Sequence, residues 1–266
     1  MKIGIIGCTG RMGQALVREV LATPGCTLAG ATVRPGSAAR GQDVGSLCGA
    51  GAAGLAATDD PVPLIAAADA VIDFTTPESS VRLAALCAQA QTALVVGTTG
   101  LDEMQEAVLH TAARHAPVVY AANTSVGVTL LQALVEQVAA TLGPDEFDIE
   151  IVEMHHRMKV DAPSGTALAL GRAAARGRGV DLAHVQRRAR DGHTGLRPAG
   201  EIGFAVLRGG DVAGEHTVLF AGANERIELT HKATDRRIFA RGAVRAALWA
   251  AAQPAGLYGM RDVLGL

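Results

Sequence analysis

The sequence predicts an α/β protein of two units: a doubly wound parallel sheet, and a smaller α+β unit with a mixed, open sheet. In the first half of the chain, short apolar runs alternate with alanine-rich helical segments, which is typical of parallel strands joined by helices. After residue 125 the pattern changes to several strands separated by turn residues. A length of 266 residues allows each unit its own core.

The amino terminus predicts the first strand, turn and helix of the parallel sheet. Lys2 to Ile6 forms a short apolar strand, a helical pattern runs from Gln14 to Ala22, and between them lies Gly7-Cys8-Thr9-Gly10-Arg11-Met12-Gly13. Glycines at such a turn let a pyrophosphate approach the helix amino terminus, so the segment indicates a Rossmann-like dinucleotide-binding fold. Because the spacing is GxxGxxG rather than the commoner GxGxxG, a tight turn without a ligand is the alternative.

The second predicted strand covers residues 28–33 and ends at Arg34. In this fold an acidic residue about twenty positions after the glycines binds the ribose 2′-hydroxyl, whereas an arginine accommodates a 2′-phosphate. No Asp or Glu follows until Asp43. We therefore expect NADPH to be preferred, with NADH as the other cofactor to consider.

Three further apolar runs predict the remaining parallel strands, at residues 70–75, 93–96 and 118–120. Helices are predicted after the first two of these strands, at residues 77–88 and 102–115, and the Gly- and Ala-rich segment 36–62 predicts an irregular loop. Parallel strands present their carboxyl ends at one edge of the sheet, where a cofactor binds. Cofactor contacts are therefore expected at Gly97-Thr98-Thr99 and at Ala121-Ala122-Asn123-Thr124.

The second unit is predicted to begin near Ser125, which divides the chain into residues 1–125 with 236–266, and residues 126–235. It is expected to hold an apolar helix from Thr129 to Thr141 and four strands, at residues 148–154, 202–207, 217–220 and 226–231. A closing helix from about 235 to 252 is expected to return to the first unit. An open face of the mixed sheet is a natural surface for oligomerisation.

The segment from Glu153 to Thr166 carries the densest set of chemically active side chains. Two imidazoles and two cations, at His155, His156, Arg157 and Lys159, are followed by Pro163-Ser164-Gly165-Thr166 and a helix. Ser164 can cap that helix, and the amides of the next two residues would favour an anion. We predict a site for a small, carboxylate-rich substrate, with a solvated basic loop as the alternative. Because neighbours in an extended chain point to opposite faces, the two histidines are expected to have different roles.

Composition and charge exclude several classes of protein. With 24 basic and 26 acidic residues and 3% aromatic residues, the chain has no general electrostatic reason to bind nucleic acid or a membrane surface. Neither a secretion signal nor an apolar run of about 18 residues is evident, so we expect a cytoplasmic protein. The cysteines have no CxxC spacing, and adjacent histidines diverge, so no disulfide framework or metal site is expected; the thiols are Cys8, Cys26, Cys48 and Cys87.

Taken together, these motifs resemble the 4-hydroxy-tetrahydrodipicolinate reductase family, also called dihydrodipicolinate reductases, of bacterial diaminopimelate and lysine biosynthesis. The similarity runs nearly from end to end, and its most specific part is the histidine block. The matching segments are Gly7 to Gly13, Val96 to Gly100, Ala121 to Gly127, His155 to Ala167, Gly200 to Phe204, Arg208 to Asp211 and Gly214 to Val218.

The resemblance implies a homotetramer that reduces a cyclic dicarboxylate imine with NADPH or NADH and releases tetrahydrodipicolinate and, from the hydroxylated substrate, water. It implies that His155 is the proton donor and Lys159 the second catalytic residue. The implied substrate-binding residues are His156, Gly165 and Thr166. The implied cofactor-binding residues are Gly7, Cys8, Thr9, Gly10, Arg11, Met12, Arg34, Gly97, Thr98, Thr99, Ala121, Ala122, Asn123 and Thr124.

Two residues depart from the family pattern. Many relatives have an acidic residue just before the position of Arg34, and Val33 in its place argues against NADH. Relatives often carry Phe at the position of Thr124, so a packing contact near the nicotinamide is expected to be missing.

A protein of another class also fits part of the sequence. A non-catalytic NADP(H)-binding sensor with an oligomerisation domain would explain the glycine loop and the mixed sheet, but it leaves the histidine block without a role. A semialdehyde dehydrogenase is excluded, because its second domain would need a cysteine nucleophile and no cysteine follows Cys87.

Overall fold

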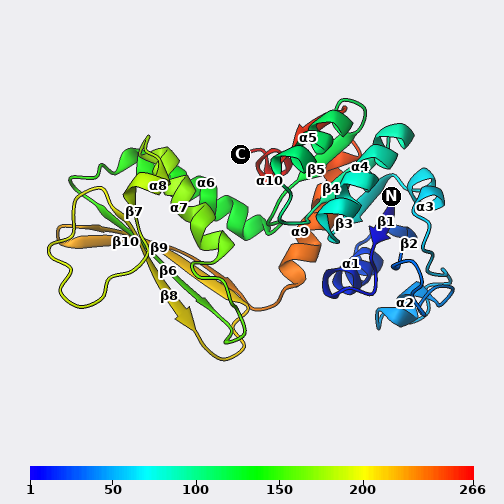
Figure 1. The fold of residues 1–266 in the computed structure, drawn as a ribbon, viewed down its shortest axis with the longest axis horizontal. Coiled ribbons are helices and arrows are strands. Elements are labelled where there is room, and N and C mark those ends of the chain that lie inside the picture. Colours follow the sequence, from blue (N-terminus) through cyan, green and yellow to red (C-terminus); the bar gives the residue numbers. More distant parts are fainter. The chain divides into compact units, whose positions relative to one another are not determined.

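The computed structural model describes residues 1–266 and divides the chain into two units (Figure 1). Unit 1 comprises Met1–Val126 and Arg237–Leu266, and unit 2 comprises Gly127–Arg236. The end of the chain therefore returns to the unit in which the chain begins. None of the helices has the length and apolar character needed to cross a membrane.

Unit 1 contains a six-stranded parallel sheet in the order β11-β5-β4-β3-β1-β2. Its strands are β1 (Lys2–Ile6), β2 (Thr27–Ala31), β3 (Ala70–Asp73), β4 (Ala93–Val96), β5 (Pro117–Tyr120) and β11 (Gly256–Tyr258). The central strands β3 and β4 are buried at every residue, as expected where helices cover both faces. The strand order reverses between β2 and β3, on either side of β1, which places a topological switch point at the end of β1.

Helices cover both faces of this sheet, and each face has its own apolar cluster. In one cluster, α1 (Arg11–Ala22) and α9 (Arg237–Ala250) pack against Ile72 and Val95. In the other, α3 (Val62–Ala67), α4 (Pro77–Ala90) and α5 (Glu103–Ala112) pack against Val71 and Leu94. Adjacent strand residues thus face opposite helical layers, which confirms the predicted doubly wound architecture.

The prediction of an irregular loop over residues 36–62 is wrong at one place, because α2 (Val44–Leu47) lies within it. The cause is the carboxylate of Asp43, which accepts hydrogen bonds from the backbone N–H groups of Ser46, Ala53 and Gly54. One side chain therefore caps the short helix and closes the loop behind it. These bonds also hold the pKa of Asp43 well below its usual range, the bond from Ser46 being the largest cause.

Unit 2 contains a five-stranded mixed sheet in the order β10-β9-β6-β8-β7. The strands are β6 (Asp148–His155), β7 (Gln186–Arg187), β8 (Ile202–Arg208), β9 (Gly214–Gly222) and β10 (Glu225–Ala233). The central strand β6 pairs in parallel with β8 and antiparallel with β9. The four predicted strands are confirmed, and the two-residue β7 was not predicted.

One face of the mixed sheet is covered by helices, and the other is open. Ile149 and Ile151 of β6 pack beneath α6 (Val126–Thr141) and α7 (Gly165–Gly177) (Figure 1). Burial alternates along β6, so Asp148, Glu150, Val152 and Met154 lie on the opposite, half-exposed face. The remaining helices are α8 (Leu182–Val185) in this unit and α10 (Met260–Leu264) in unit 1.

Helix α9 packs closely on the loop that follows β5. The Thr124 hydroxyl donates a hydrogen bond of 2.7 Å to the carbonyl oxygen of Phe239. Gly242, one turn further along α9, lies so near the same loop that an added Cβ would be 1.7 Å from the carbonyl oxygen of Thr124. The closing helix thus supports a segment predicted to bind the cofactor.

We therefore expect Gly242→Ala to lower the free energy of unfolding by about 1–3 kcal/mol, because no side-chain rotation relieves a clash with backbone. This loss opposes the gain of about 1 kcal/mol that Ala normally brings to a helix. Urea unfolding measures the effect, and Gly143→Ala is the control, because its added Cβ has no atom within 4 Å. Equal stability of the two variants would contradict the close packing.

Candidate active site

The glycine loop after β1 has the geometry that a dinucleotide-binding turn requires. Gly7 has a φ of +71°, a left-handed conformation that favours glycine, and it turns the chain out of the strand. Gly10 is the N-cap of α1 and provides no side-chain capping bond. A Cβ at Gly13 would lie 2.1 Å from the carbonyl oxygen of Gly7, so only glycine lets α1 approach the turn. The first amides of α1 are thereby directed toward the space where an anion would lie.

The side chains in this loop differ in their access to a ligand. Thr9 and Arg11 are exposed, and Met12 is half-buried. Cys8 is completely buried, and burial raises the pKa of its thiol to about 11, with nearby Cys48 as a smaller cause. The Cys8 thiol is therefore not accessible to a cofactor, and the Cys8 N–H donates to the carbonyl oxygen of Thr32 at 2.8 Å.

A buried carboxylate at the end of β3 organises the neighbouring loops. Asp73 accepts hydrogen bonds from the hydroxyls of Thr75 (2.5 Å), Ser80 (2.5 Å) and Thr98 (3.4 Å). Burial raises the pKa of Asp73, and the hydroxyl bonds oppose that rise. Sequence reasoning assigned no role to Asp73, although an Asp ending an otherwise apolar strand was the available signal. The Thr98 hydroxyl also accepts a hydrogen bond from the Thr75 N–H. The side chain of Thr98, a predicted cofactor residue, therefore bonds to other residues of the protein.

The other predicted cofactor segments follow neighbouring strands at the same carboxyl edge. Gly97 follows β4 and lies against Phe74, whose Cζ would be 2.1 Å from an added Cβ. After β5, the Asn123 side chain accepts from the Ser125 N–H, and Thr124 faces α9. Arg34 is exposed shortly after β2. The structure therefore brings the predicted cofactor segments to one edge of the sheet, where several of their side chains hold the loops in place.

In unit 2, strand β6 ends in a buried acid–imidazole pair. Glu153 and His155 share the helix-covered face of β6 and are 1% and 8% exposed. An oxygen of Glu153 lies 2.5 Å from His155 Nδ1. The same carboxylate accepts two bonds from the Arg208 guanidinium, at 2.8 and 3.0 Å, and one from the Ser164 N–H, at 2.9 Å.

The charges around this pair shift both pKa values downward. For Glu153, burial acts to raise the pKa, but the bonds from Arg208, His155 and the Ser164 amide outweigh it and hold the pKa below its usual value. For His155, burial lowers the pKa most, the carboxylate of Glu153 opposes that effect, and the positive charges of Lys159 and Arg208 add to it. The pKa of His155 therefore lies below its usual value, so its neutral form is favoured.

A third imidazole, His216 of β9, completes the buried part of the site. Its ring meets that of His155 edge-on at a centroid distance of 5.0 Å, and its Nε2 lies 3.0 Å from the Ser164 hydroxyl. The Ser164 oxygen also accepts from the Ala167 N–H, so its own proton is available to His216. Burial lowers the pKa of His216 to about 4, and the nearby His155 adds to this shift. His216 was not assigned a role from the sequence, although the matching segment Gly214 to Val218 contains it.

The polar groups around the buried pair are more accessible. Lys159 lies 2.9 Å from a carboxylate oxygen of Asp161, and its side chain is 21% exposed. His156 is half-buried, and its Nε2 is 3.1 Å from the Arg236 guanidinium. The two adjacent histidines thus occupy different environments, as predicted from the extended chain.

The amino end of α7 agrees with the sequence prediction. Ser164 is its N-cap, accepting a hydrogen bond from the Ala167 N–H. Gly165 is exposed, and nothing lies within 4 Å of an added Cβ, whereas Thr166 is half-buried. Sequence reasoning missed Glu153, Arg208 and Arg236 as members of this site. No group of three or more His, Cys, Asp or Glu side chains is placed to hold a metal ion.

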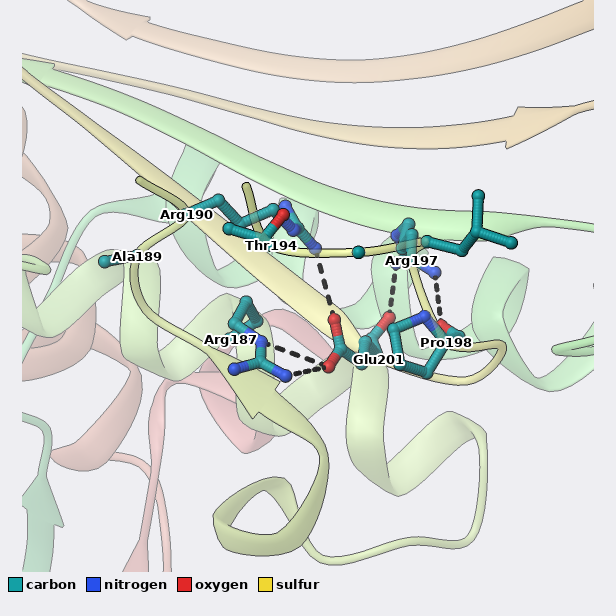
Figure 2. A pocket seen from close by; sticks show the side chains of 9 residues that line it. Arg187, Ala189, Arg190, Thr194, Arg197, Pro198 and Glu201 are labelled. Atoms are coloured by element: carbon teal, nitrogen blue, oxygen red, sulfur yellow. Dashed lines mark hydrogen bonds and ion pairs between the residues drawn. The ribbon is translucent and has the colours of Figure 1, made fainter. Parts of the chain in front are cut away.

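A separate pocket in unit 2 contains none of the predicted site residues. Figure 2 shows its lining, in which Arg187 and Arg190 both contact Glu201, at 2.6 and 3.4 Å. Arg197 contacts Asp148 at 2.5 Å and Glu150 at 3.0 Å. These arginines pair with carboxylates of β6 and with Glu201, which precedes β8, so the pocket is lined by ion pairs and is not a free anion site.

A doubly wound sheet with a glycine turn at its switch point, and a second unit with a buried acid–imidazole pair among cations, define a two-domain dinucleotide-dependent oxidoreductase. The family model for the N-terminus of dihydrodipicolinate reductase matches residues 1–124, and the model for its C-terminus matches residues 127–264. The chain belongs to the dihydrodipicolinate reductase family, which confirms the resemblance found in the sequence.

Individual members of this family are similar to the chain over its whole length. A 4-hydroxy-tetrahydrodipicolinate reductase from Methylocella silvestris is 59% identical over all of this chain and 97% of that protein. One from Rhizobium rhizogenes is 56% identical with the same coverage. Among solved structures, a dipicolinate-bound dihydrodipicolinate reductase from Paenisporosarcina sp. TG-14 is 25% identical, with a TM-score of 0.76 and 98% coverage of both chains.

The buried state of His216 predicts a pH dependence of stability. A histidine whose pKa is about 4 when folded and near 6.5 when unfolded stabilises the fold above pH 6.5, and this contribution is lost as the pH falls toward 4. We expect the loss to be roughly 1–3 kcal/mol between these pH values. Unfolding free energies measured at each pH should fall less steeply for His216→Gln than for the exposed control His193→Gln. Identical pH curves for the two variants would rule out this contribution.

Proposed function

We propose that this chain is a 4-hydroxy-tetrahydrodipicolinate reductase, which uses NAD(P)H to reduce its cyclic imine substrate to tetrahydrodipicolinate with loss of water. The observation that carries the proposal is the Glu153–His155 pair, which ends β6 beside Lys159 and the amino end of α7. The names of relatives more than half identical over the full chain support it.

The substrate is a small dicarboxylate, and unit 2 offers cationic groups suited to it. His156 contacts Arg236. Lys159, three residues after His156, is partly exposed. The amino end of α7 adds a partial positive charge, and Gly165 has no side chain to cover it. We assign one carboxylate to this helix end, with Thr166, and the other to the cations. The dipicolinate bound to the Paenisporosarcina relative supports this class of ligand.

Proton transfer is the chemical task of unit 2. Hydride addition to a conjugated imine leaves negative charge on the ring, which must take up a proton. A general acid at that point typically contributes about 10²- to 10⁴-fold to the rate. We assign this role to His155, and we assign to Lys159 the stabilisation of the developing negative charge.

The nicotinamide dinucleotide is assigned to the carboxyl edge of the sheet in unit 1. The left-handed turn at Gly7 and the start of α1, which has no side-chain cap, fit a pyrophosphate. When bound, the cofactor supplies the hydride. Backbone groups of the loops after β1, β4 and β5 would hold it, since several side chains there bond to the protein.

NADPH is proposed as the preferred cofactor. Arg34 is exposed after β2, while the preceding residue, Val33, is buried and offers no carboxylate for a ribose 2′-hydroxyl. A guanidinium at this position favours a 2′-phosphate.

We further propose that the active form is a cytoplasmic homotetramer. The open face of the mixed sheet carries apolar side chains that its own helices do not cover, including Val152, Met154, Leu207 and Leu219. Such a face supports self-association. The four free cysteines suit a reducing compartment. A non-catalytic sensor is not favoured, because it gives no role to the buried acid–imidazole pair.

Substituting either proposed catalytic residue tests the function. We expect His155→Ala and Lys159→Ala to lower kcat by about 10²- to 10⁴-fold, because each removes a group that acts on the transition-state charge. The affinity for NADPH should stay nearly unchanged. Steady-state rates of NADPH oxidation measure the effect, with His184→Ala and Lys232→Ala as exposed controls in the same unit. Full turnover by either active-site variant would refute its assignment.

The cofactor preference has a separate test. We expect Arg34→Ala to raise the KM for NADPH roughly 10- to 100-fold, because the variant loses a hydrogen bond to a charged phosphate. The KM for NADH should change little. The matched control is Arg40→Ala, another exposed arginine of the same loop, which pairs with Asp59. A similar rise for both cofactors would show that Arg34 does not contact the 2′-phosphate.

A further inference from the structure

Three elements of unit 2 converge on the carboxylate of Glu153. The groups within hydrogen-bonding distance of it are His155 Nδ1 on β6, the Arg208 guanidinium on β8 and the Ser164 N–H at the N-cap of α7. Only 1% of Glu153 is exposed. A buried carboxylate is costly unless its oxygens are fully paired, and here both oxygens are paired. The residue is therefore the centre of a hydrogen-bond network.

We propose that Glu153 is the positioning residue of the reaction, which orients His155 through Nδ1 and fixes the amino end of α7 through the Ser164 amide. This inference rests on the proposed function, because it explains how the assigned proton donor and the assigned substrate-binding helix end are held together. In the structure, Glu153 alone bonds to His155 Nδ1 and to the Ser164 N–H.

The geometry determines which nitrogen of His155 exchanges the proton. An ionised carboxylate can only accept hydrogen bonds, so the Nδ1 facing Glu153 must carry a hydrogen. Nε2 is then the atom that gives up a proton and is left as the acceptor. It lies beside Gly214, where an added Cβ would be only 3.0 Å away. The absence of a side chain at Gly214 thus keeps the space around the reacting nitrogen open.

Glu153 is also the only neighbour that favours the charged form of His155. Lys159 from the loop after β6 and Arg208 from β8 both disfavour the imidazolium, and so does burial. His216 of β9, which meets the same ring, offers no compensating negative charge. Arg208 in turn keeps Glu153 ionised. Replacing the carboxylate with a neutral amide should therefore make the imidazolium harder to form.

The test compares Glu153→Gln with Glu150→Gln, a change on the opposite face of the same strand, where the carboxylate pairs with Arg190 and Arg197. The pH profile of kcat is measured for both variants and the wild type. A general acid works only while protonated, so activity falls as the pH rises through the pKa of His155. We expect this alkaline limb to move to lower pH in Glu153→Gln, with kcat near neutral pH reduced about 10- to 100-fold and the KM for NADPH unchanged.

Two further measurements separate positioning from a general loss of structure. Glu153→Asp keeps the charge and should restore the alkaline limb toward its wild-type position while kcat stays low. Nitrogen-15 NMR of labelled histidine in the free wild-type protein should show neutral His155 with its proton on Nδ1. This reading does not depend on activity, and it remains decisive if Glu153→Gln fails to fold.

Three results are informative. A wild-type His155 protonated on Nε2, or a Glu153→Gln profile that matches Glu150→Gln, would overturn the positioning role. A wild-type protein without reductase turnover would instead refute the proposed function, while the NMR reading would still report on the Glu153–His155 contact. A shifted limb together with an Nδ1–H tautomer would support both.

Discussion

The geometry of unit 2 depends on the buried ion pair between Glu153 and Arg208. The guanidinium binds both carboxylate oxygens, and it also donates to the carbonyl oxygen of Asp161. Burial acts to raise the pKa of this carboxyl, and the bonds from Arg208 are the largest cause that opposes burial. Arg208 thus favours the anion that accepts the Nδ1–H of His155. Because the pair joins β6 to β8, the parallel register of these two strands sets the position of the proton donor.

Unit 1 also contains a buried carboxylate, that of Asp73, but its hydrogen-bond donors are different. Asp73 is surrounded by hydroxyl groups and has no guanidinium partner. Burial raises its pKa, whereas the bonds from Arg208, His155 and Ser164 outweigh burial at Glu153 and lower that pKa. Its bonds connect the loops after β3 and β4 through Thr75 and Thr98. Hydroxyl and amide donors thus satisfy the buried oxygens of Asp73 without a positive charge. In unit 2 the assigned proton transfer needs an anion beside His155, and Arg208 keeps Glu153 ionised.

Local patterns were sufficient to predict most strands, the Ser164 cap and the glycine turn, because each depends on residues close together in the chain. Contacts between distant residues could not be predicted in this way. Arg208 follows Glu153 by 55 positions and His216 follows Ser164 by 52, and only the register of the mixed sheet brings them together. Strands β7 and β11 are too short to show the alternation of apolar and polar residues that predicts a strand. Helix α2 depends on the carboxylate of Asp43, which also bonds to the backbone of residues 53 and 54.

The departure at Thr124 shows how the loop after β5, which is assigned to the cofactor, is held without an aromatic residue. A phenylalanine there could act only by packing, whereas the threonine hydroxyl bonds to the backbone of α9 and the side chain is buried. Gly242 lets α9 approach the same loop closely. The closing helix therefore supports the loop. In this chain the residue at position 124 anchors the loop through a hydrogen bond instead of through aromatic packing.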